Sequence, residues 1–221
     1  MYNHRSLTLV TPPASEPVAL ADMKAWARVD ITDDDTLIAD LITSARQFCE
    51  DFTGRQFMPA TYLATWDRFP MLPNSQYAPG NPNAITPPVN NMWPLNPSAW
   101  AIRLPMPPVT GVTNIQYYDT NGVLQTLSPA TYLLDLASKP ARIVPVAGGY
   151  WPMTSFQPSA VQVQYQSGDG NPPAAYVTAI KLLAAYWYQN REALILENGI
   201  HAQEIPLGVK TLLWTRRIME F

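Results

Sequence analysis

Cysteine, histidine and charge are all scarce in this chain of 221 residues. It holds one Cys and two His, and 14% of its residues are charged, against about 25% in an average globular protein. A single Cys excludes an internal disulfide, and a structural zinc site needs several Cys or His at short spacing. Because Cys49, His4 and His201 are widely scattered, we expect neither a zinc site nor a His-based catalytic triad.

Long hydrophobic runs and catalytic fingerprints are also missing. The run Leu182–Tyr188 is too short to span a bilayer, and no N-terminal stretch has the order of a signal peptide. The chain contains no Gly-x-Ser-x-Gly elbow, phosphate-binding Gly loop or dinucleotide fingerprint. We therefore expect a soluble, cytoplasmically made protein with no membrane contact, no cofactor and no enzymatic activity.

Proline is abundant, at 23 residues. No charged side chain occurs in residues 69–102, and residues 71–98 hold seven Pro and six Asn. Pro removes backbone donors and Asn favours turns, so this stretch is predicted to be a long loop with little regular structure. Tyr77 and Trp93 are its candidates for docking on a neighbouring subunit or another partner.

The strongest helical signal covers residues 34–53. Apolar residues repeat there at spacings of three and four, and Gly54 stands where a helix end favours a left-handed residue. We expect this helix to pack on the helix of residues 174–191. The face predicted to make that contact comprises Leu37, Leu41, Ala45, Phe48 and Phe52.

A cluster of carboxylates precedes and begins this helix, formed by Asp30, Asp33, Asp34 and Asp35. Carboxylates suit the positive end of a helix, and Thr32 or Asp33 could cap it. A calcium loop would need alternating ligands and a central Gly, which are missing here. Helix capping is therefore favoured over metal binding.

Short strand signals follow the loop. The clearest is a β-hairpin around Asp119–Gly122, because Asn-Gly tolerates positive φ. The strands expected from alternation and turn residues are 62–66, 102–104, 112–118, 123–127, 132–136, 142–144 and 161–165. They predict a small, antiparallel β region.

Helical spacing returns after Pro172-Pro173, and Pro206 can begin a last helix. The predicted fold class is therefore α+β: a helical bundle with an inserted small antiparallel β region and a long Pro/Asn-rich loop. Residues 1–58 would supply N-terminal helices, including one over Leu20–Val29. Residues 59–171 would form the β-rich insert, and residues 172–221 the C-terminal helices.

Several segments resemble phage head–tail connector proteins, also called head-completion adaptors. They are Glu16–Asp30, Asp33–Asp35, Phe52–Arg55, Arg103–Val109, Gly149–Pro152, Trp187–Glu192 and Ile205–Val209. The resemblance rests on the order of these segments and covers nearly the whole chain. Two departures stand out: the loop of residues 71–98 interrupts the pattern, and Ala19 replaces an expected Thr or Ser cap, which weakens that helix start by about 1 kcal/mol.

The resemblance implies a structural subunit of a virion neck that forms a ring, usually of twelve copies. Such a ring would contact the portal protein on one side and a tail or stopper protein on the other. Double-stranded DNA would pass through it without sequence-specific binding, and the chain could be a monomer until it meets the portal.

The resemblance also places portal contact at the C-terminus, where Arg beside aromatic residues is typical of interface anchors. The candidate residues are Pro206, Leu207, Val209, Leu212, Leu213, Trp214, Arg216, Arg217 and Phe221. Closing the helical core is the alternative role of this segment. Alternatives to a connector are another tail-completion or baseplate protein and, less favoured, a metal-dependent hydrolase using the Asp cluster.

Overall fold

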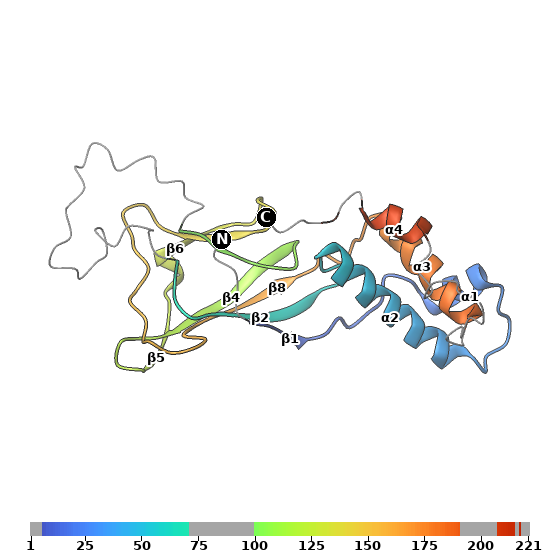
Figure 1. Ribbon diagram of the computed structural model, residues 1–221, viewed down its shortest axis with the longest axis horizontal. Coiled ribbons are helices and arrows are strands. Elements are labelled where there is room, and N and C mark those ends of the chain that lie inside the picture. Colours follow the sequence, from blue (N-terminus) through green and yellow to red (C-terminus); the bar gives the residue numbers. More distant parts are fainter. Residues whose placement is uncertain (1–5, 71–99, 191–206, 215–216, 218–221) are drawn as a thin grey trace, which may run out of the picture. The chain divides into compact units, whose positions relative to one another are not determined.

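The computed structural model describes residues 6–70, 100–190, 207–214 and 217. In this part of the chain, four α-helices accompany two sheets built from antiparallel strand pairs, which confirms the α+β class (Figure 1). The chain divides into two compact units. A β unit joins Met1–Thr11 to Thr61–Ser167, and a helical unit joins Pro12–Ala60 to Gly168–Phe221. The predicted loop of residues 71–98, with Tyr77 and Trp93, lies outside the described residues.

Four helices form the helical unit: α1 (Leu20–Ala27), α2 (Asp35–Thr53), α3 (Ala174–Gln189) and α4 (Leu207–Trp214). Their apolar side chains form one buried cluster, in which α2 and α3 pack together as predicted. The core therefore draws on segments separated by more than a hundred residues.

The buried face of α2 differs from the prediction. Leu37 is exposed, while Ile38, Ile42 and Cys49 are buried. Ala45 is buried as expected, whereas the other three predicted residues, Leu41, Phe48 and Phe52, only border the cluster. The apolar stripe of α2 is wide, and its buried line follows Ile38, Ile42, Ala45 and Cys49, about one residue away from most of the predicted positions.

The helix ends also correct one expectation. α2 ends at Gly54, whose φ of 65° is left-handed as predicted. At its start, however, Asp34 occupies the capping position without making a side-chain cap hydrogen bond. The Asp34 carboxylate instead accepts a hydrogen bond from the Tyr188 hydroxyl at 2.6 Å, and Asp35 pairs with Lys24 at 2.5 Å. Two of the four clustered carboxylates, Asp34 and Asp35, therefore hold α2 to α3 and α1.

Two sheets form the β unit. The larger has the order β1-β2-β8-β4-β5, and the smaller has the order β3-β7-β6. The bounds of the larger sheet are β1 Ser6–Thr11, β2 Ala60–Trp66, β8 Val161–Ser167, β4 Val109–Tyr118 and β5 Leu124–Thr126. Those of the smaller sheet are β3 Ile102–Arg103, β7 Arg142–Pro145 and β6 Tyr132–Asp135. Every predicted strand is present, and β1 is an additional edge strand that the sequence analysis missed.

Local sequence explains the central strands. In β8, Val161, Val163 and Tyr165 are buried while Gln residues alternate with them, the period-two pattern of a strand with one face in a core. The predicted hairpin joins β4 and β5, with Gly122 at a φ of 76°. The Asp119 carboxylate accepts hydrogen bonds from the backbone N–H groups of Val123 and Asn121, which lower its pKa and fix the turn.

Candidate interaction surface

Helix α4 has two different faces. Val209 and Leu213, four residues apart on one side, are fully buried in the helical core. Trp214 is 59% exposed, although large aromatic side chains are usually buried for most of their area. The same short helix therefore closes the core and presents an aromatic side chain to solvent.

Trp214 belongs to a chain of aromatic contacts across three helices. Its ring centroid lies 6.4 Å from that of Phe52, which stacks at 6.2 Å on Phe48. Phe48 in turn meets Trp187 edge-on at 6.3 Å. The guanidinium of Arg217 lies 5.0 Å from the Phe52 centroid and 5.6 Å from that of Trp214, within cation–π range. We call these five residues the aromatic patch.

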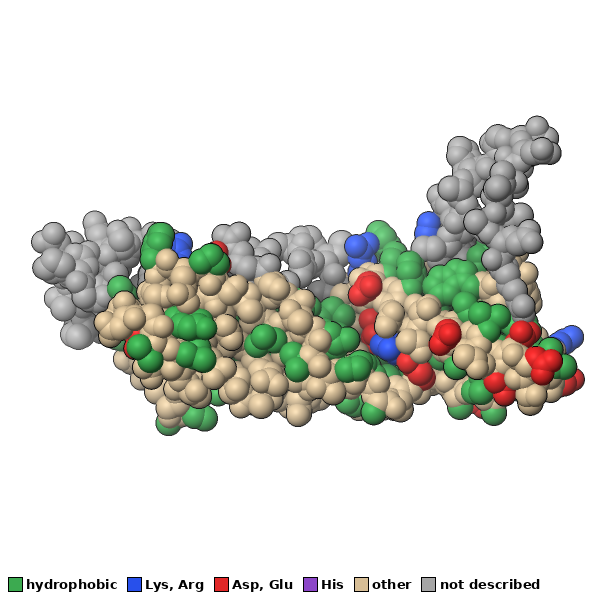
Figure 2. All heavy atoms as spheres, turned by 90° about the horizontal axis from the view of Figure 1, so that it is seen from below, with side chains coloured by type: hydrophobic (Ala, Val, Ile, Leu, Met, Phe, Trp, Pro, Cys, Tyr) green, Lys and Arg blue, Asp and Glu red, His purple; other side chains and the backbone are tan. Residues whose placement is uncertain are grey.

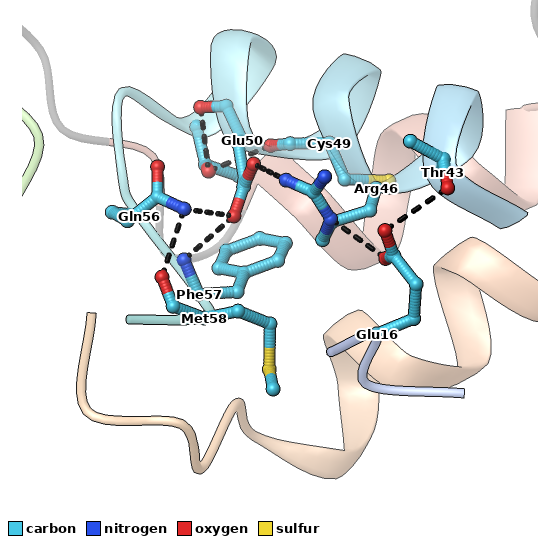
Figure 3. A network of polar contacts seen from close by, with 9 residues as sticks. Glu16, Thr43, Arg46, Cys49, Glu50, Gln56, Phe57 and Met58 are labelled. Carbon is cyan, nitrogen blue, oxygen red and sulfur yellow. Dashed lines mark hydrogen bonds and ion pairs between the residues drawn. The ribbon is translucent and has the colours of Figure 1, made fainter. Parts of the chain in front are cut away.

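A buried polar network joins α2 to the segments before and after it (Figure 3). The Glu16 carboxylate accepts hydrogen bonds from Arg46 Nε at 2.7 Å and Thr43 Oγ1 at 3.0 Å, and Arg46 also pairs with Glu50, one turn further on. Glu50 Oε1 accepts hydrogen bonds from Gln56 Nε2 and Phe57 N–H, each at 2.9 Å. These contacts hold the side of α2 that carries Arg46 and Glu50 against the segments before and after the helix.

Burial governs the charges of this network. Desolvation raises the pKa of Glu50, although the hydrogen bond from Phe57 and the charge of Arg46 oppose the shift. Desolvation alone would lower the pKa of Arg46, but the hydrogen bond to Glu16 and the charge of Glu50 outweigh it and raise the value. The network therefore keeps Arg46 and Glu50 paired in a buried position, where an unpaired charge would carry a large desolvation cost.

The predicted C-terminal contact residues fall into three groups. Val209 and Leu213 are core residues, and Leu212 is half-buried against the same cluster. Trp214 and Arg217 are exposed and belong to the aromatic patch. Leu207 is the first residue of α4, and its side chain lies outside the described set, as do Pro206, Arg216 and Phe221.

Two residues of the patch, Phe48 and Phe52, were predicted to face the helix of residues 174–191. Both of them, like Trp187 of that helix, are only partly buried. The i,i+4 spacing of the two Phe residues indicates a shared face. The contact between Phe52 and Trp214 joins residues that are far apart in the sequence, so no local pattern indicates it.

The described residues contain no group of three or more His, Cys, Asp or Glu side chains arranged to hold a metal ion. Cys49 is buried, and burial together with the nearby Glu50 charge raises its pKa to about 12. Among the helices described here, none is both long and apolar enough to cross a bilayer.

Comparison with known proteins supports the resemblance seen in the sequence. Residues 17–90 match the family model of the phage gp6-like head-tail connector protein, which confirms the resemblance over that segment. No curated protein sequence matches the chain.

Solved structures extend the likeness of fold to nearly the full length. A chain from the neck of the empty gene transfer agent particle, computed with C6 symmetry, has a TM-score of 0.66 and 19% identity, covering 98% of this chain and 97% of that one. A chain from the virion of the native particle has a TM-score of 0.67 and 18% identity, with coverages of 97% and 96%. A chain from the native neck, computed with C12 symmetry, has a TM-score of 0.60 and 20% identity, with coverages of 98% and 97%. At these identities the comparison establishes a shared fold.

Proposed function

We propose that this chain, whose residues 17–90 carry the head–tail connector signature, is a structural subunit of the neck of a tailed phage. It would form a ring that joins the portal protein to a tail or stopper protein, and genomic DNA would pass through the ring. The observation that carries the proposal is the agreement of the connector match with a fold shared along nearly the whole chain with particle-neck chains. A twelve-copy ring follows from the resemblance, and the chain acts as a binding protein without catalysis.

We place the portal contact at the aromatic patch. Trp, Tyr and Arg are the residue types most enriched among side chains that dominate binding energy. Here an exposed Trp and an Arg adjoin the Phe52 ring, which stacks on Phe48 of the same helix. Arg217 could also donate hydrogen bonds to a carboxylate of the partner.

The test of the ring is negative-stain microscopy of the purified protein mixed with its portal. A ring of density added to one face of the portal supports the connector. Binding to a tail or baseplate protein without portal decoration would instead favour a tail-completion role.

The test of the patch compares two exposed tryptophans. Trp214→Ala should weaken portal binding about tenfold or more, because loss of a central aromatic anchor commonly costs that much. Trp26→Ala on α1 is the matched control, since Trp26 is 48% exposed and lies under Lys181 rather than in the patch. Unchanged melting temperatures would show that both variants fold. Equal binding by the two variants would place the portal contact elsewhere while leaving the connector role standing.

A further inference from the structure

The β unit exposes a second apolar surface that the portal contact does not use. Residues 148–159, which we call the docking loop, carry three large apolar side chains at a spacing of three: Tyr150, Met153 and Phe156. The first two are about half exposed and Phe156 is fully exposed. Isolated exposed apolar residues are ordinary, but this loop exposes three large apolar side chains within seven residues.

Residues that lie between the exposed side chains in sequence fix the docking loop to the rest of the β unit. The buried Trp151 ring stacks on Phe69 at 4.8 Å, and its Nε1–H donates to the Trp100 carbonyl at 2.8 Å. Ser155 N–H donates to the Tyr118 carbonyl at 2.9 Å. Because each tether adjoins an exposed residue, the loop presents its apolar side chains in an ordered state and loses little entropy on binding.

The last tether is Ser159. Its N–H donates to the Asp67 carboxylate, and its hydroxyl donates to the Thr65 hydroxyl, each at 3.2 Å.

The loop itself carries no charge, because no charged residue occurs between Arg142 and Asp169. Such a surface suits an apolar protein partner better than nucleic acid, whose binding depends on Lys and Arg contacts to phosphates.

Charge is unevenly divided between the two units on the face that Figure 2 shows. Acidic side chains gather there on the helical unit, whereas the β unit shows few charged side chains and several apolar ones. An apolar contact between copies is therefore better suited to the β unit than to the helical unit.

The β unit also exposes a second apolar region, at the edge of its smaller sheet. Strand β6 is an edge strand of the smaller sheet, and Leu133, Leu134 and Leu136 at this edge are all exposed. We call these residues the leucine edge. The one acid of β6, Asp135, is paired with Arg142 of the adjacent strand at 2.7 Å, so its charge is already compensated within the subunit.

Two different, complementary surfaces on one subunit are what a head-to-tail ring requires. Two aromatic side chains and a Met bury on the order of 500 Å², below the roughly 800 Å² per partner of a stable pair. Such a contact would not hold a dimer in solution. It would act once the portal holds the copies side by side, where avidity multiplies weak contacts.

We propose that the docking loop of one copy packs on the leucine edge of the next copy in the ring. This inference rests on the proposed ring function. The resulting contact is heterologous and apolar, and each copy contributes Phe156 to one neighbour and Leu133 to the other.

A charge-swap experiment on portal-assembled rings tests this contact. Phe156→Glu and Leu133→Lys should each reduce ring occupancy on the portal about tenfold or more, because each variant places an unpaired charge in an apolar contact. The double variant should recover occupancy, since the carboxylate introduced at position 156 would then face the ammonium introduced at position 133 of the next copy. Val123→Glu, at another exposed apolar position of the same unit, is the matched control and should assemble normally. All three wild-type side chains are exposed, so melting temperatures should stay close to the wild-type value.

Disulfide trapping gives an independent readout. In the double variant Phe156→Cys with Leu133→Cys, mild oxidation of assembled rings should yield a ladder of covalently linked copies. The native thiol does not interfere, because Cys49 is buried.

The outcomes separate the two proposals. Normal rings from Phe156→Glu, a disulfide confined to single chains, or trapping of a tail protein at position 156 would each overturn the contact while leaving the connector role intact. A wild-type chain that fails to assemble on the portal would overturn the connector role and the contact with it.

Discussion

The buried ion pair of α2 shows how single residues depend on their partners. Arg46 and Glu50 are both almost fully buried, and each has a further polar partner in Glu16 or Gln56. Removing one partner of a buried pair leaves an uncompensated charge. We expect Arg46→Met to lower the free energy of unfolding by about 3 kcal/mol, as measured by urea denaturation.

The same variant should acquire a characteristic pH dependence. Without its cation, buried Glu50 keeps only neutral hydrogen-bond partners, so its folded pKa rises further above the ordinary value of 4.5. The folded state then binds a proton more tightly than the unfolded chain, so the stability of the variant falls as pH rises from 4.5 through the folded pKa. Adding Glu50→Gln should flatten this slope and recover part of the loss. A pH slope equal to the wild type in both variants would contradict the assignment.

Cys49 should be chemically silent in the folded protein. Its pKa is raised to about 12, chiefly by burial, so almost no thiolate forms at neutral pH. We expect a maleimide to label it only after denaturation. Ser44→Cys, at an exposed position of the same helix, should be labelled at once. Rapid labelling of native Cys49 would show that the α2 core opens readily.

At the scale of elements, the rotation of α2 about its axis can be tested by comparing substitutions on its buried and exposed sides. Ile42 is buried and Leu37 is 37% exposed. Ile42→Asp should destabilise the protein by more than about 3 kcal/mol, through lost burial and an unpaired buried charge. Leu37→Asp should cost less than about 1 kcal/mol. Similar melting temperatures for the two variants would indicate that another face of α2 is buried.

The turn at Gly168 is a second test. Gly168 has a φ of 89°, and a Cβ there would lie 2.2 Å from the Met58 carbonyl oxygen. Gly168→Ala should therefore cost about 3 kcal/mol or more, from strain and from displaced backbone. Gly148 also has a positive φ, of 76°, but faces open space, so Gly148→Ala should cost only about 1 kcal/mol. Comparing the melting temperatures of the two variants separates the cost of the steric clash at Gly168 from the cost of a positive φ alone.

At the scale of the molecule, chain segments far apart in sequence complete one core. Val209 and Leu213 join a cluster that begins at Val18. Truncation after Glu204 should therefore destabilise the helical unit by several kcal/mol, because burying each aliphatic side chain contributes about 2 kcal/mol. A lower melting temperature and increased dye binding would show this loss. Trp214→Ala should leave both unchanged, which makes it the cleaner test of portal binding. A truncated protein with wild-type stability would show that α4 is dispensable to the core.

Local sequence alone determined most element positions. The acidic first turn, the apolar repeat and Gly54 defined α2 to within a residue, and Asn121-Gly122 defined the hairpin. These signals act between residues close in the chain, so they can be read without knowing the fold. The connector resemblance likewise came from segments in order along the chain.

Tertiary structure alone decided which surfaces meet. A wide apolar stripe does not reveal the line on which α3 lies, and β1 could be recognised only through its pairing with β2, some fifty residues away. The burial of Arg46 and Glu50 likewise depends on Glu16 and Gln56, which hydrogen-bond to them from outside α2. The dual role of α4 has the same origin, because burial depends on partners distant in sequence, whereas periodicity and capping depend on neighbours.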